Sequence, residues 1–206
     1  METKPTFEED LASIHRLMDR SVKFVSLSGL AGILAGTYAL LGAATAYYTL
    51  YYPAPVLAAN FFPVPDTGTA RQLVLIAVVV LVASLITGYW LSARNARKAN
   101  VSVWGDASRR LVVNLGIPLF TGGFFCLIML SQGHIDLAAT STLIFYGLAL
   151  VNASPNLFDE VRYLGLSEIG LGLVSLLVPG YSLLFWAGGF GVLHILYGAI
   201  LYRKYE

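Results

Sequence analysis

Two ionisable residues lie inside long apolar runs near the end of the chain. Glu168 lies in VRYLGLSEIGLGLVSLLV, which begins at Val161, and His194 lies in SLLFWAGGFGVLHILYGAILY, which ends at Tyr202. Each run is long enough to cross a bilayer. An ionisable group at the bilayer centre costs about 2.5–3.5 kcal/mol even on the mildest scale. Both residues are therefore candidates for function.

The two side chains are expected at the same depth. At 1.5 Å per residue, Glu168 lies about 10 Å inside one helix, and His194 lies about 13 Å from the basic end of the next. Pro179-Gly180 joins the runs as antiparallel neighbours, so the two side chains can lie together. A carboxylate next to an imidazole suits proton exchange or cation binding. Four polar residues are predicted to join them: Asn114 and Ser28 at comparable depth, and Tyr163 and Tyr197 on the cytoplasmic side.

Structural roles for the same two residues are the alternative. Glu168 can pair with Arg162 or Lys23 near the interface, since long basic side chains reach toward the headgroups. His194 can be a packed histidine bonded to a backbone carbonyl. A water-accessible cavity that reaches Glu168 would favour transport, a dry bundle would favour a partner role, and a closed pocket that holds lipid would favour an enzyme.

Other chemistries lack their motifs. The chain contains no GxxxxGK[ST], HExxH, CxxC or GxSxG sequence. His134 and Asp136 share a short loop, which is too few ligands for a metal site. Only His194 lies within a span, so a bis-histidine haem in one chain is excluded, and no cofactor is expected.

The composition is that of a membrane protein. Hydrophobic residues make up 57% of the chain and charged residues 12%, against about 25% charged residues in a soluble domain. A surface that faces lipid needs no charged coat. The net charge of +1 gives no reason to expect a nucleic-acid partner, and the single Cys126 allows no intrachain disulfide.

The apolar runs predict an all-α, polytopic membrane helical bundle with six transmembrane helices in residues 22–206. The first four spans are expected at 22–48, 72–91, 111–130 and 137–151, and the last two within 161–202. Lys and Arg collect in the N-terminus, in loops 94–110 and 153–162, and at the C-terminus, which predicts that both termini are cytoplasmic. Residues 1–21 are predicted to form a cytoplasmic amphipathic helix.

Small residues indicate how the first span packs. Gly32 and Gly36 form a GxxxG pair, which lets a second helix approach closely. We expect that helix to belong to the same chain; a second copy, in a homo-oligomer, is the alternative.

Similar openings at Val22, Arg110 and Val161 (VKFVSLS, RLVVNLG, VRYLGLS) support the hypothesis of three repeated helical hairpins. Basic and aromatic anchors at any span that starts inside explain the same likeness.

The stretches VRYLGLSEIGLG and GFGVLHILYGAILYRKYE resemble a family of small six-span bacterial membrane proteins of uncharacterised activity. The resemblance covers the last quarter of the chain and, more loosely, the first span. It implies a bacterial cytoplasmic (inner) membrane and no activity.

Three functional classes remain. A small transporter or channel with a polar intramembrane site is favoured, because ionisable groups within spans mark such pathways. A non-catalytic membrane scaffold or regulatory partner, using the GxxxG face and the N-terminal helix, is the alternative, and an integral-membrane enzyme is third. The expected contacts are the lipid bilayer and, at the basic cytoplasmic face, anionic lipid headgroups.

Overall fold

A computed structural model describes residues 28–51, 67–98 and 104–206, and all regular structure in these ranges is helical. The helices are α2 (Gly29–Tyr51), α3 (Thr67–Lys98), α4 (Asp106–Ser131), α5 (Ile135–Ala153), α6 (Asp159–Leu177), α7 (Ser182–Trp186) and α8 (His194–Tyr205). A short 3-10 helix, η1 (Ser154–Asn156), follows α5, and a π-helix, η2 (Ala187–Leu193), joins α7 directly to α8. The amphipathic helix predicted for residues 1–21, and Lys23, lie outside the described residues.

Five of these helical rods are long and apolar enough to cross a membrane, namely α2, α3, α4, α5 and the continuous α7–η2–α8. The chain is therefore a multi-pass membrane protein. Six transmembrane helices were expected, but α6 is not in this group. Its 19 residues include Asp159, Glu160, Arg162 and Glu168.

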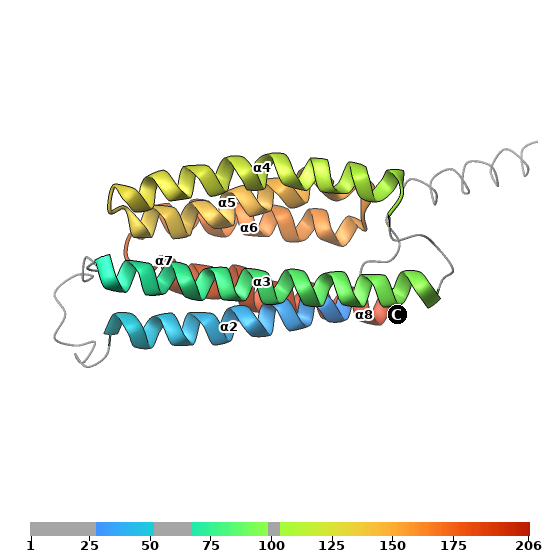
Figure 1. Ribbon diagram of the computed structural model, residues 1–206, viewed down its shortest axis with the longest axis horizontal. Helices are drawn as coiled ribbons and strands as arrows, with labels where there is room; N and C mark the ends of the chain where they lie inside the picture. The colour runs from blue at the N-terminus through green and yellow to red at the C-terminus, as the bar shows by residue number, and fades with distance from the viewer. Residues whose placement is uncertain (1–27, 52–66, 99–103) are drawn as a thin grey trace, which may run out of the picture.

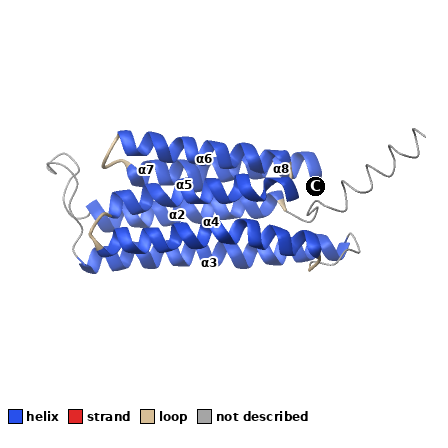
Figure 2. Ribbon diagram, turned by 90° about the horizontal axis from the view of Figure 1, so that it is seen from above, coloured by secondary structure: helices blue, strands red, loops and turns tan. Residues whose placement is uncertain are grey.

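The helices lie side by side in two layers (Figure 1). In one layer α5 packs between α4 and α6, and in the other α2 packs between α3 and α8. The layers meet where α5 and α6 contact α7, η2 and α8. Figure 2 shows the same rods from above, all running along the long axis of the bundle.

The two ends of the bundle differ. The turns after α4 and α6 lie at one end, here called the His134 end, and they contain Gly133 and Gly180 with φ of 82° and 87°. This left-handed backbone strains residues with a side chain, so glycine is required at both turns. The other end carries Leu157 and the end of α8, and is called the Leu157 end.

Two helix pairs make the same close contact through glycine. A Cβ on Gly36 of α2 would lie 2.5 Å from the carbonyl oxygen of Gly191 and 2.9 Å from the amide nitrogen of Ile195. A Cβ on Gly147 of α5 would lie 2.6 Å from the carbonyl oxygen of Gly165 in α6. In both pairs backbone packs directly on backbone, so only glycine fits.

The GxxxG pair of the first span is used inside the chain. A Cβ on Gly32 would lie 3.1 Å from Cα of Gly198 in α8, and Gly36 packs against η2 and α8. The expected internal contact is thus the one observed. The hypothesis of three repeated hairpins rests in part on Val22, which is outside the described residues, and stays a prediction.

We expect Gly36→Ala to destabilise the bundle by about 1–3 kcal/mol, the usual cost of overpacking. Gly123→Ala in α4 is the control, because a Cβ there meets no atom within 4 Å. It should leave stability unchanged or raise it, since Ala favours helix over Gly. Thermal unfolding in detergent can be followed with a thiol-reactive dye, because the single cysteine, Cys126, is buried. Equal melting temperatures for the two variants would contradict this packing.

Candidate functional site

Glu168 lies at the centre of the contact between the two layers. Its side chain is fully buried, with 0% exposure. Gly189 of η2 faces it so closely that a Cβ there would overlap both Oε2 of Glu168 and Leu143 of α5. Neither carboxylate oxygen has a hydrogen-bond partner among the described residues. A buried polar group without partners is costly, so a structural role alone does not explain this carboxylate.

His194, the first residue of α8, is the neighbour of this carboxylate. Its Nδ1 lies 3.3 Å from Oε1 of Glu168, within ion-pair distance. The same Nδ1 lies 3.1 Å from the carbonyl oxygen of Gly189, and Nε2 lies 2.8 Å from the hydroxyl of Tyr146. A carbonyl oxygen can only accept, so Nδ1 carries the proton, and in the neutral ring Nε2 accepts from Tyr146. His194 is therefore satisfied without a charge.

The π-helix η2 determines the direction in which the His194 side chain points from α8. Pi-helical turns hold more residues than α-helical ones, and they occur often at functional sites. Each residue added to a helix turns the following part by about 100°. Three glycines of η2, at 188, 189 and 191, let this wider turn fit, since Gly189 packs on Glu168 and Gly191 packs on Leu40. The site thus depends on a local irregularity of the last rod.

Glu168 and His194 occupy matching positions on α6 and α8. Residues 165–172 read GLSEIGLG and residues 191–198 read GVLHILYG. In both stretches the titratable residue is the fourth, Ile is the fifth, and glycine is the first and the last. The flanking glycines make the close contacts to α5 and to α2 described above. Two equivalent helix pairs therefore each deliver one titratable side chain to their common interface.

The net charge of the pair depends on how many protons it holds. With Glu168 ionised and His194 neutral, the pair carries one negative charge in a buried position, which costs several kcal/mol. One further proton on either residue brings the net charge to zero. Release of this proton is favourable only if water or another cation replaces it.

The structure does not bring Asn114, Ser28 or Tyr163 to this pair. The backbone carbonyl of Asn114 accepts a hydrogen bond from Asn152, at the α4–α5 contact. Ser28 is buried, but it adjoins Gly29, which packs on Tyr202, about 12 Å along α8 from His194. The side chain of Tyr163 is 60% exposed.

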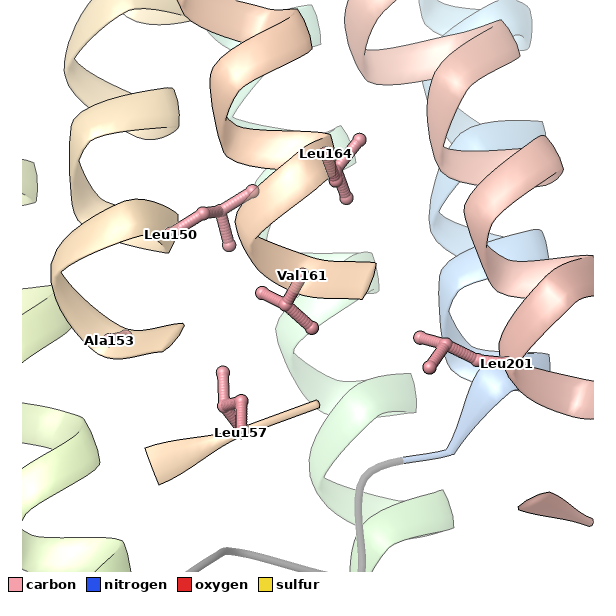
Figure 3. Close-up of a cluster of buried hydrophobic side chains, with 6 residues drawn as sticks. All are labelled: Leu150, Ala153, Leu157, Val161, Leu164 and Leu201. Carbon is pink, nitrogen blue, oxygen red and sulfur yellow. The ribbon is translucent and has the colours of Figure 1, made fainter. Parts of the chain in front are cut away.

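Tyr197 lies toward the Leu157 end, where it packs against a buried apolar cluster drawn in Figure 3. The cluster consists of Leu150, Ala153, Leu157, Val161, Leu164 and Leu201. Beside it, Nζ of Lys204 lies 2.6 Å from Oε1 of Glu160, and the Phe158 and Tyr205 rings stack 4.1 Å apart. These contacts close the Leu157 end of the bundle.

The His134 end is hollowed instead. A cavity of about 450 Å³ lies between the layers there; Trp186 is among its lining residues, and Glu168 and His194 are not. The Trp186 ring lies 5.0 Å from that of Phe190, which lies 5.9 Å from that of His194. The cavity therefore does not reach Glu168, and the observation that would have favoured transport is not made among the described residues.

Sequence reasoning missed Tyr146 and Gly189. A tyrosine within an apolar run needs a partner for its hydroxyl, and that signal was present in the sequence. The run AGGFG was a signal for close approach of another element to the backbone.

Two further observations bear on the other functional classes. Since α8 covers Gly32 and Gly36, this face is not free for a partner protein. Within the described ranges, no group of three or more His, Cys, Asp or Glu residues is placed to hold a metal ion.

No family model, curated protein or solved structure matches the chain.

Proposed function

We propose that the protein is a small proton-coupled membrane transporter, in which Glu168 and His194 together hold and release one proton per cycle. The observation that carries this proposal is a fully buried carboxylate with no hydrogen-bond partner among the described residues, 3.3 Å from an imidazole. Such a pair is costly to keep in a membrane bundle unless its charge changes during function.

The unequal ends of the bundle favour a transporter over a channel. A cavity lies between the layers toward the His134 end and is lined as far along α7 as Trp186, whereas the apolar cluster around Leu157 and the Lys204–Glu160 pair lie at the other end. An alternating-access transporter in a state open to one side only would have unequal ends of this kind. A channel would need a continuous polar path past Glu168.

The proposed membrane arrangement has six crossings, with α6 as the polar one. Its 19 residues span about 28 Å, close to the hydrocarbon thickness, and its Glu168 faces protein rather than lipid. Basic residues gather at the Leu157 end: Arg94, Arg97, Lys98, Arg109, Arg110, Arg203 and Lys204. We therefore place this end, with both termini and contacts to anionic lipid, on the cytoplasmic side of a bacterial inner membrane.

Proteoliposomes loaded with a pH-sensitive dye test the function. With an acidic lumen, we expect external NaCl, KCl or tetraphenylphosphonium chloride to speed the loss of luminal protons above the rate in protein-free liposomes. One responding cation is sufficient, because it shows exchange of a cation for a proton. No response to any of the three would overturn the proposal.

Tyr146→Phe is expected to slow this exchange by up to about tenfold, the equivalent of one hydrogen bond. The change removes the hydroxyl that lies 2.8 Å from Nε2 of His194 and keeps the ring contact with Phe190. Flux should be compared at several pH values. Tyr38→Phe is the control, since that hydroxyl bonds Thr87 in the α2–α3 contact. An equal effect of both changes would mean that Tyr146 acts only on stability.

A further inference from the structure

The cavity at the His134 end has the size of a small-molecule site. Its volume of about 450 Å³ lies in the usual range of 300–1,000 Å³. Residues of α2, α3, α4, α5 and α7 form its walls, most of them apolar, among them Ala43, Ala46, Leu50, Leu73, Ile76 and Leu130. A strongly hydrated ion would lose its water there without replacement, so the walls suit an apolar body.

The charge around this cavity has one sign. Asp136 lines it, and among the described lining residues there is no Lys or Arg; His134 and Cys126 are the other titratable residues of the lining. Asp136 is held in place by a hydrogen bond from the hydroxyl of Ser182 at the start of α7. A carboxylate beside an apolar space attracts a cation and repels an anion.

The lining of the cavity includes an aromatic side chain. Trp186 lines it, and the face of an indole ring is the strongest aromatic partner for a cation. Trp186 also contacts Phe190, whose ring lies 5.0 Å from that of Tyr146 and 5.9 Å from that of His194. A molecule that contacts Trp186 is therefore connected to His194 through the ring of Phe190.

We propose that this cavity binds a lipophilic monovalent cation, with Asp136 supplying the opposite charge and Trp186 the aromatic face. The proposal names the substrate class of the transporter proposed above and rests on that function. In a proton–cation exchange, entry of this cation offsets the charge that the Glu168–His194 pair gains when its proton leaves. The protein then holds either the proton or the cation, so only one positive charge is in its apolar interior at any time.

Calorimetric titration of the full chain in detergent tests the binding itself, using tetraphenylphosphonium and tetraphenylborate as ions of like shape and opposite charge. We expect the cation to bind and the anion not to bind. Asp136→Asn should weaken cation binding by about tenfold or more, because one opposite charge is lost. Asp159→Asn, the same change at the Leu157 end, should leave the affinity unchanged. Ala46→Phe keeps the charge but fills the cavity, and should also weaken binding.

The outcomes separate this inference from the proposed function. Equal binding of the two ions would identify an apolar groove for lipid chains and would overturn the inference. Unchanged affinity in both Asp136→Asn and Ala46→Phe would move the binding elsewhere and overturn it as well. Cation binding without proton flux in liposomes would refute the transporter alone, whereas flux with Na⁺ or K⁺ and no tetraphenylphosphonium binding would refute the cavity alone.

Discussion

Proteoliposomes that contain Glu168→Gln are expected to show cation-driven proton loss no faster than protein-free liposomes, whichever cation drives the wild type. Glutamine keeps the shape of the side chain but neither ionises nor carries an exchangeable acidic proton. His194 does not replace the lost carboxylate, because a proton on its ring would then leave an unpaired positive charge buried in the bundle. The readout is the initial rate of luminal alkalinisation.

Stability distinguishes this functional loss from unfolding. The Glu168 oxygens have no hydrogen-bond partner among the described residues, so an apolar side chain of similar length removes a costly buried group. Glu168→Met should therefore melt at or above the wild-type temperature in the Cys126 assay and still lack flux. A large fall in the melting temperature of Glu168→Met would show that the carboxylate holds the bundle together. Flux at the wild-type rate in Glu168→Gln would remove Glu168 from the mechanism.

The meeting of Glu168 and His194 was predictable from the sequence, because two spans joined by a tight turn fix the relative depth of their residues. Depth does not fix direction around the helix axis. For that reason Asn114 and Ser28 were expected at the site at comparable depth, and both lie in other helix contacts. Tyr163, next to Arg162, lies on an exposed face of α6.

The apolar pattern also hid two features that only packing specifies. The same kinds of residue form π-helices and α-helices, so the sequence does not show that residues 187–193 are π-helical. The resulting rotation of His194 about the helix axis is therefore not visible in the sequence either. The cavity forms from several helices that are far apart in the chain, and its position depends on how the two layers meet. The polar character of α6 was visible, since its charged residues stand in the sequence, but hydropathy does not say whether protein covers them.

His194 was expected either to bond a backbone carbonyl or to pair with Glu168, and the two arrangements are compatible. His194 does contact a backbone carbonyl, that of Gly189, and through the same nitrogen it faces Glu168. The described ion-pair partner of Glu168 is His194, not Arg162. The carbonyl contact orients the ring, and the oriented ring is what makes the carboxylate part of a pair.

Gly189→Ala is expected to abolish proton exchange, although it changes neither titratable residue. A Cβ at Gly189 would overlap Oε2 of Glu168 and lie 2.5 Å from Cδ2 of Leu143, so the carboxylate must move away from Nδ1 of His194. Gly188→Ala is the matched control in the same π-helix, because its Cβ would meet only Cδ2 of Leu171, at 3.7 Å. Both changes have the same effect on helix propensity, so their difference reports the contact with Glu168.

The measurement is proton flux in liposomes for both variants, with melting temperatures beside it. We expect Gly188→Ala to keep most of the wild-type rate and Gly189→Ala to fall to the rate of Glu168→Gln. If the clash with Glu168 is the cause, the double variant Gly189→Ala with Glu168→Ala should regain thermal stability relative to Gly189→Ala, because the shorter side chain makes room, and should still lack flux. Equal flux in the two glycine variants would mean that the position of the carboxylate next to His194 does not matter for exchange.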